Sequence, residues 1–149
     1  MVSTRDLSRI PLFRGLSEEH QAAIARLARE VACSEGDVLF REGDAASQLY
    51  ILLEGRISIQ VKLSSRPESL AVASLSQYGQ LVGWSGLIHA NYTASAVCDT
   101  DSRLLTIDAN ELSALLRENP EAGFPVMEQV AITISERLRN IQRVVLKTL

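Results

Sequence analysis

The sequence predicts an α+β fold, in which an antiparallel β-roll, also called a jelly roll or double-stranded β-helix, is flanked by an N-terminal helix and by C-terminal helices. Two observations support this fold class. Over residues 33–107, short apolar runs alternate with glycine-bearing turns, which is typical of an antiparallel sandwich or barrel. On both sides of this region, apolar residues recur at helical spacing. We therefore expect a single domain with a helical region at 10–32, a β-roll at 33–107 and helices at 108–149.

The composition is that of a globular protein without a membrane-spanning segment. The chain has 149 residues, of which 46% are hydrophobic and 22% are charged, and it contains no apolar run of the ~18 residues that cross a bilayer. A net charge of -3 argues against a protein whose main activity is to bind nucleic acid through its phosphates. The N-terminus lacks the apolar core of a secretory signal, so we expect a cytoplasmic protein.

The N-terminal helix is predicted from its capping residue and its apolar spacing. Ser17 is a typical N-cap residue, and Glu18 and Glu19 follow in the first turn, where the helix dipole favours acids. The apolar residues at helical spacing are Ile24, Leu27, Ala28 and Val31. We therefore expect an amphipathic helix that continues through this whole segment.

The β region is predicted to contain seven or eight short strands, because its apolar runs are short and its turns carry glycine. The runs are VLF, LYILL, ISIQV, LAVASL and RLLTI, and the turns are residues 35–37, 42–44, 54–56 and 79–86. The polar segment KLSSRPESL, residues 62–70, contains a proline. It is predicted to be a hairpin loop.

Two helices are predicted after the β region. Asp108 and Glu111 have the spacing of a capping box, and Pro120 is expected to end or bend the helix that they begin. Beyond the proline, apolar residues alternate steps of four and three, which is the spacing of an a/d seam. The seam residues are Met127, Ala131, Ile134, Leu138, Ile141 and Val145.

This seam has two interpretations, which the spacing alone leaves open. The helix packs either against its own β-roll or against the same helix of a second copy. Several cations lie near its C-terminal end, where the helix dipole favours them. They are Arg137, Arg139, Arg143 and Lys147. We interpret this basic run as a solvated face rather than as a DNA contact.

The residues that carry enzyme and metal chemistry are sparse. Cys33 and Cys98 are far apart in the sequence and lack C-x-x-C spacing, so we expect two small buried apolar side chains rather than a zinc site, a disulfide or a redox pair. His20 and His89 are expected to be ordinary exposed residues, too few for a metal-dependent cupin. No nucleophile–base pair or carboxylate pair is evident, and we expect neither an enzyme nor a metal site.

The order of elements, a helix, a glycine-punctuated β-roll and a long amphipathic helix, resembles the cyclic nucleotide-binding domain family. That family supplies the regulatory module of catabolite activator-type transcription factors, cyclic-nucleotide-dependent kinases and gated channels. The stretches PLFRGLSEEH and GDVLFREGDAASQLYILLEGRISI carry the resemblance, as do the glycines at 36, 43, 55, 79 and 83. The similarity extends from about Ile10 to Leu149.

The resemblance also locates a ligand pocket. In the family, the nucleotide sits in a cassette of the form F-G-E-x-A-L-x-x-x-x-P-R-A/T-A. Its glutamate accepts a hydrogen bond from the ribose, its arginine pairs with the phosphate, and backbone N–H groups face the phosphate. Residues 82–95 match this spacing without a gap. The equivalent pocket residues are Gly83, Trp84, Ser85, Gly86, Leu87, Tyr92, Thr93, Ala94 and Ser95.

Both charged residues of the cassette are replaced in this sequence. Trp84 stands in the position of the glutamate, Thr93 in that of the arginine, and Tyr92 in that of the proline. A hydrogen bond to a charged group contributes roughly 1.5–3 kcal/mol, so losing two weakens binding by about a hundred- to ten-thousand-fold. We therefore expect a non-enzymatic regulatory module that does not bind cAMP or cGMP in the usual way.

Several alternatives stay open at this point. Trp84 either plugs the disused pocket or lines it for a neutral or weakly acidic small-molecule ligand. A true cyclic nucleotide receptor would need another cation at the phosphate, and the candidates are Arg41, Lys62, Arg66 and Arg103. A third alternative is a ligand-free dimerisation or interaction module with a protein partner.

The resemblance further implies self-association, because the long helix forms the dimer seam in transcription factors of the family. We expect a parallel homodimer through residues 124–146, with Leu138 and Ile141 near its centre. Catabolite activator-like proteins carry a helix-turn-helix after this helix, and this sequence contains no such DNA-binding element.

Overall fold

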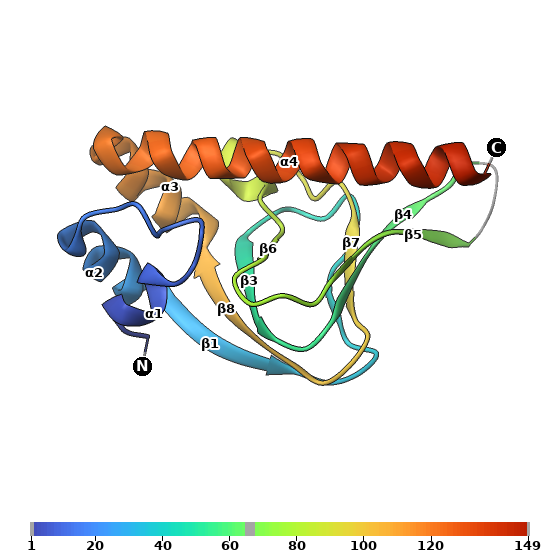
Figure 1. Cartoon of the computed structure of the whole chain (residues 1–149), viewed down its shortest axis with the longest axis horizontal. Coiled ribbons are helices and arrows are strands. Elements are labelled where there is room, and N and C mark those ends of the chain that lie inside the picture. Colours follow the sequence, from blue (N-terminus) through green and yellow to red (C-terminus); the bar gives the residue numbers. More distant parts are fainter. Residues whose placement is uncertain (1, 65–67, 149) are drawn as a thin grey trace.

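The computed structural model describes residues 2–64 and 68–148, and Figure 1 shows their arrangement. The helices are α1 (Thr4–Ser8), α2 (Glu18–Leu27), the 3-10 helix η1 (Ser85–Ile88), α3 (Ala109–Glu118) and α4 (Pro120–Thr148). The strands are β1 (Ala28–Cys33), β2 (Val38–Phe40), β3 (Gln48–Glu54), β4 (Ile57–Lys62), β5 (Ser69–Leu75), β6 (Leu81–Val82), β7 (Ser95–Cys98) and β8 (Ser102–Asp108).

The eight strands form two antiparallel four-stranded sheets, which confirms the predicted β-roll. The strand order is β1-β8-β3-β6 in one sheet and β2-β7-β4-β5 in the other. Each sheet combines strands from distant parts of the chain, and the two sheets pack against each other. Ile57 and Val72 of one sheet meet Leu52 and Leu104 of the other in a buried apolar cluster. The hairpin predicted at 62–70 connects β4 and β5, although residues 65–67 lie outside the described part of the chain.

The N-terminal helix is shorter than its apolar spacing predicts. Ser17 caps α2 as expected, and its hydroxyl accepts a hydrogen bond from the His20 N–H at 3.2 Å. The helix ends at Leu27, however, and the following residues form β1, in which Val31 lies opposite Leu104 of β8. The expectation that the helix continues through Val31 was wrong, because pairing with β8 outweighs the local helical spacing. The β-roll therefore begins at Ala28.

The boundaries of the C-terminal helices follow the sequence signals. The Asp108 side chain accepts a hydrogen bond from the Glu111 N–H at 2.9 Å and so caps the start of α3. α3 ends at Glu118, and α4 begins at Pro120. Proline suits this first position because its missing N–H would have no partner in the helix there.

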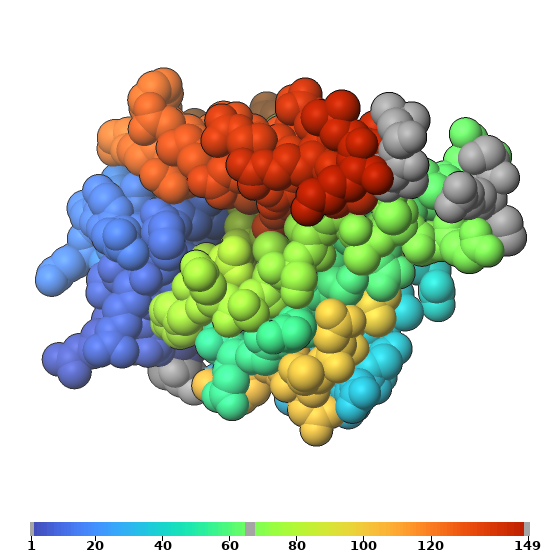
Figure 2. All heavy atoms as spheres, turned by 45° about the vertical axis from the view of Figure 1, so that its right-hand side comes forward, coloured from blue at the N-terminus to red at the C-terminus, as the bar shows by residue number. Residues whose placement is uncertain are grey.

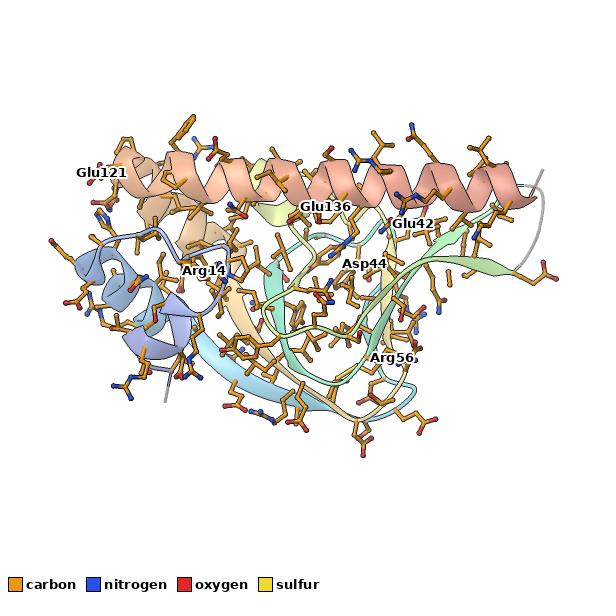
Figure 3. The ribbon with its side chains drawn as sticks, in the orientation of Figure 1. Arg14, Glu42, Asp44, Arg56, Glu121 and Glu136 are labelled. Carbon is orange, nitrogen blue, oxygen red and sulfur yellow. A yellow bond between two sulfur atoms is a disulfide. The ribbon has the colours of Figure 1, made fainter. Side chains whose placement is uncertain are left out.

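Helix α4 lies across the whole length of the molecule (Figure 1). Its N-terminal part packs through Val126 and Val130 into an apolar core shared with α1, α2 and α3, while Ile141 packs against the core between the sheets. The His20 Nε2 atom of α2 lies 3.3 Å from the Glu121 Oε1 atom at the start of α4, and Figure 3 labels Glu121 at that end of the helix. In the view of Figure 2, α4 forms the upper edge of the molecule.

Cys33 and Cys98 are joined by a disulfide, which links β1 of one sheet with β7 of the other. The expectation of two separate apolar side chains was wrong. The two residues are 65 positions apart, so their spacing carried no signal of proximity. The roll brings them together at one end of the two sheets, where the Gly36 N–H also donates to the Cys98 carbonyl at 2.7 Å.

Candidate functional site

The predicted cassette lies between the end of β6 and the start of β7, beneath α4. Gly83 and Trp84 follow β6, η1 comes next, and the chain returns through Tyr92 and Thr93 into β7. The space left between these residues is only about 20 Å³. It is lined by Phe40, Ile59, Gly83, Trp84, Ser85, Tyr92, Thr93, Ala94 and Arg137.

Two aromatic rings fill the floor of this site. Phe40 and Tyr92 stack with their ring centroids 3.8 Å apart and their planes at 13°. Gly83 allows their close approach, because a Cβ atom at this position would lie 3.0 Å from the Phe40 ring and 3.3 Å from the Tyr92 ring. Its φ of +83° also favours glycine. The resemblance implies that this glycine lets the backbone approach a ligand. In this chain, its missing side chain makes room for the two packed rings instead.

The Tyr92 hydroxyl is held in one orientation by the backbone of β3. It donates to the Gln48 carbonyl at 2.5 Å and accepts from the Gln48 N–H at 3.3 Å. Burial raises the pKa of Tyr92 above its ordinary value, so the phenol keeps its proton and remains a donor at neutral pH. The ring is thus fixed by stacking on one side and by two hydrogen bonds at its tip.

Trp84 and Arg137 close the side of the site that faces α4. Trp84 is half-buried, and the Arg137 guanidinium carbon lies 5.3 Å from the centre of its ring, which is the geometry of a cation–π contact. Arg137 also donates a hydrogen bond to the Leu81 carbonyl of β6. The arginine is only 8% exposed, and burial lowers its pKa to about 10. It therefore stays positively charged at neutral pH.

Sequence reasoning missed Arg137, which it assigned to a solvated basic face. Its position contained a signal. The buried face of α4 runs through Ala122, Val126 and Val130, and Arg137 lies seven residues beyond Val130, two helical turns further on nearly the same face. Arg139 and Arg143 are exposed, as expected.

The structure brings six of the nine predicted pocket residues to the cavity, and three lie elsewhere. Gly86 packs against the β2–β3 loop, where an added Cβ would lie 2.3 Å from the Ala46 carbonyl oxygen. Leu87 is buried in the core beside α3 and α4. The Ser95 hydroxyl accepts a hydrogen bond from the Glu42 N–H at 2.8 Å instead of facing the cavity. Thr93 is exposed and precedes β7, which begins at Ser95.

The alternative phosphate-binding cations lie away from this cavity, as far as the described residues reach. Arg103 pairs with Glu30 and with Glu54 on the outer side of the sheet. Arg41 and Lys62 are exposed and do not line the cavity. The fourth candidate, at position 66, lies outside the described residues.

The predicted seam of α4 divides into two rows. Met127, Ile134 and Ile141 are half-buried against the body of the domain. Ala131, Leu138 and Val145 are exposed, and Leu138 is 55% accessible. Phe124 precedes this exposed row by the same seven-residue step and is 73% accessible. The side of α4 that carries this row is therefore not covered by the chain's own fold.

None of the described helices combines the length and the apolar character that a membrane span requires.

Comparison with known proteins assigns the family. The model of the cyclic nucleotide-binding domain family matches residues 30–119, more than half of the chain, so this protein belongs to that family. Among curated proteins, it is 26% identical over 136 residues to the CRP-like cAMP-activated global transcriptional regulator of Mycobacterium tuberculosis. It is 27% identical over 114 residues to a putative potassium channel protein of Rhodopseudomonas palustris. The matches cover 90% and 76% of this chain, but only 58% of the regulator and 27% of the channel.

Solved structures agree with this assignment. A putative cyclic nucleotide-binding protein from Geobacter metallireducens superimposes with a TM-score of 0.80 and 30% identity, over 93% of this chain and 99% of the other. The N-terminal domain of a transcriptional regulator from Streptomyces coelicolor gives a TM-score of 0.69 and 26% identity, over 94% of both chains. Helix α4 thus resembles the dimerisation helix of CRP-like domains.

Proposed function

We propose that this protein is a non-enzymatic regulatory module of the cyclic nucleotide-binding family that does not bind cAMP or cGMP through the family's usual contacts. The observation that carries the proposal is the filled cassette. Trp84, Tyr92 and Phe40 pack around a space of about 20 Å³, and Arg137 closes it from α4.

The size of this space argues against a nucleotide in this arrangement. A cavity of 20 Å³ is about that of a single ordered water, whereas sites for small-molecule ligands usually enclose some hundreds of Å³. Entry of a nucleotide would require the Trp84 indole and the Arg137 side chain to move together. Their displacement would expose an aromatic ring and break a buried cation–π contact, and both changes oppose binding.

The chemistry of the lining supports the same conclusion. No carboxylate lies at the position of Trp84, so the ribose hydroxyl would find no charged acceptor there. Thr93 offers a hydroxyl but no charge for the phosphate. Losing two charge-assisted hydrogen bonds weakens binding by about 3–6 kcal/mol, which brings a micromolar site to the range of ~100 μM to 10 mM.

Relatives with this fold include proteins described as cAMP-activated and proteins described as cAMP-independent. The Mycobacterium tuberculosis regulator is described as cAMP-activated. A regulatory subunit from Trypanosoma brucei, of a protein kinase A described as cAMP-independent, has a TM-score of 0.75 to this chain at 19% identity, over 97% of this chain and 50% of that one. A triple mutant of that subunit, in which one change replaces threonine by arginine, is bound to cAMP in its A site. A protein of this fold can therefore be cAMP-independent, as we propose for this chain.

The proposed module acts as a homodimer through α4. The exposed row of Phe124, Ala131, Leu138 and Val145 keeps a seven-residue repeat over the length of the helix, which suits a parallel pair of helices. Any signal would pass through the position of α4 relative to the roll, because only different affinities for two arrangements can drive such a change.

Isothermal titration of the purified protein with cAMP and with cGMP tests the proposal. We expect no saturable heat up to millimolar nucleotide, under conditions in which a cAMP-binding member of the family titrates normally. A dissociation constant in the low micromolar range for either nucleotide would contradict the proposal. Loss of such binding in an Arg137→Ala variant would then identify Arg137 as the substitute phosphate-binding cation.

A further inference from the structure

Arg137 is the buried charged side chain of α4, and its surroundings in the described residues contain no carboxylate partner. None of the salt bridges of those residues includes Arg137. The adjacent Glu136 lies near the middle of α4 (Figure 3) and favours the charged form only weakly against the effect of burial. Burying a cation costs free energy unless protein groups replace the water that solvated it. Other groups must therefore take the place of water around the Arg137 guanidinium.

The two partners of Arg137 lie three residues apart in the chain, where the cassette begins. The guanidinium donates to the carbonyl of Leu81, where β6 begins, and lies over the ring of Trp84, which caps η1. Gly83 lies between them with a φ of +83°. One side chain of α4 therefore contacts both sides of the turn that carries the cassette.

We infer that the Arg137–Trp84 contact is an intramolecular latch, in which a side chain of α4 occupies the ligand side of the cassette and fastens the helix to the roll without a nucleotide. This inference rests on the proposed function, because it takes the cassette to be free of nucleotide. It adds a mechanism to that function. The docked position of α4 becomes a built-in state of the chain rather than a response to a ligand.

The rest of α4 shows why such a latch matters for the second half of the helix. Up to Val130, the helix is held by fully buried apolar residues. From residue 131 to residue 147, Arg137 is the one described residue that is buried. The half-buried residues of this part are Thr133, Ile134, Asn140, Ile141 and Val144. Arg137 is therefore the most deeply buried of the described side chains in this half of the helix.

The chain carries its own reporter for this contact. Trp84 is the single tryptophan of the sequence, so the intrinsic indole emission reports on the ring beneath Arg137. Arg139 supplies a matched control, because it is an exposed arginine on the same helix two residues further on.

The test compares Arg137→Ala with Arg139→Ala in the full chain, by hydrogen exchange of α4 and by tryptophan emission. We expect exchange in residues 133–147 to rise about tenfold or more in Arg137→Ala, with a red shift of the emission, while residues 122–130 change less. Arg139→Ala should match the wild type in both readouts. Exchange and emission in Arg137→Ala equal to those of Arg139→Ala would overturn the latch.

Two additions keep the test decisive. Arg137→Lys keeps the charge but not the planar fork, so it should also loosen the second half of α4, and it replaces the alanine variant if that variant does not fold. In Arg137→Ala, millimolar ethylguanidinium should restore the slow exchange and the emission, whereas ethylammonium should not. Identical behaviour of Arg137→Lys and wild type would contradict the latch. A micromolar affinity of the wild type for cAMP would refute the proposed function, whereas the latch is refuted only by an unchanged α4 in these variants.

Discussion

The ring of Tyr92 stacks on the ring of Phe40, with the two centroids 3.8 Å apart and the planes at 13°. Tyr92 stands at the position where the family's cassette has proline, so this chain adds an aromatic ring to the floor of the site. The hydroxyl of the same ring is anchored to the Gln48 backbone of β3. The packing of the cassette is therefore stabilised by contacts that extend into the sheet. Their contribution to the free energy of unfolding can be measured.

Replacing Tyr92 by phenylalanine keeps the stacked rings and removes the two hydrogen bonds to Gln48. We expect Tyr92→Phe to lower the free energy of unfolding by about 1–2 kcal/mol, because the Gln48 backbone groups lose a buried partner. Urea denaturation measures this loss. Tyr78→Phe is the control, since Tyr78 is 47% exposed and its variant should stay within ~0.5 kcal/mol of the wild type.

The same variant should change the dependence of stability on pH. Burial raises the pKa of Tyr92 in the folded protein. The stability that the protonated phenol contributes is therefore complete below the ordinary tyrosine pKa of about 10. It is lost as the pH rises through the pKa of the folded state. Burial also raises the pKa of Tyr50, which remains in both proteins. The difference between wild type and Tyr92→Phe should therefore shrink above pH 10. A difference that stays constant to pH 11.5 would argue against this account of Tyr92.

Gly86 is predicted to be the glycine of the cassette that is least tolerant of a side chain. A Cβ atom there would lie 2.3 Å from the Ala46 carbonyl oxygen and 2.5 Å from the Ala109 side chain, and the first of these neighbours is backbone. We expect Gly86→Ala to destabilise the fold by about 1–3 kcal/mol through overpacking. Gly15→Ala is the control, because a Cβ atom at Gly15 would have no neighbouring atom within 4 Å and the φ of this residue is not positive. Equal melting temperatures for the two variants would contradict the close packing of η1.

The Cys33–Cys98 disulfide is predicted to contribute to stability because it closes a long loop. The two residues are 65 positions apart, for which the chain-entropy estimate is about 4 kcal/mol. Reduction by dithiothreitol should therefore lower the urea midpoint of the wild type and leave a Cys33→Ala/Cys98→Ala variant unchanged. Two free thiols titrated in the unreduced, denatured protein would show that the bond does not form in solution.

The exposed row of α4 is predicted to hold the homodimer together. Leu138 is 55% accessible, compared with 43% for Val145, and an aspartate there would place a charge at the apolar contact between two helices. We expect Leu138→Asp to be monomeric by multi-angle light scattering at concentrations where the wild type is dimeric. Tyr78→Asp, which alters an exposed aromatic residue outside this row, should remain dimeric. A monomeric wild type would refute the dimer directly.

The sequence predicted the parts of this fold that depend on local signals. The glycine-bearing turns and alternating apolar runs located most of the strands, and the cap at Asp108 and the stop before Pro120 located two helices. The start of β1 was missed, because its helical spacing was overruled by pairing with a strand about 70 residues away. The sequence cannot report such a partner, since the pairing arises only when the sheet closes.

The candidate site was predicted in its outline but not in its contents. Trp84 and Thr93 identified the altered cassette, since a position-by-position match needs no tertiary information. Arg137 lies 53 residues beyond Trp84, and the contact between them depends on how α4 crosses the roll. The Cys33–Cys98 bond depends in the same way on the meeting of two sheets. Both relationships are tertiary, and neither has a local signature strong enough to be read alone.

The central claim is that the space between Trp84 and Thr93 is occupied by the protein itself. The measurement that tests it most directly is a high-resolution crystal structure of the wild-type protein grown with millimolar cAMP. The account predicts that the Trp84 indole and the Arg137 guanidinium stay in contact beside the stacked rings of Phe40 and Tyr92, with no nucleotide between them. Electron density for a cyclic nucleotide in that space, with Arg137 displaced from Trp84 or turned to the phosphate, would contradict it.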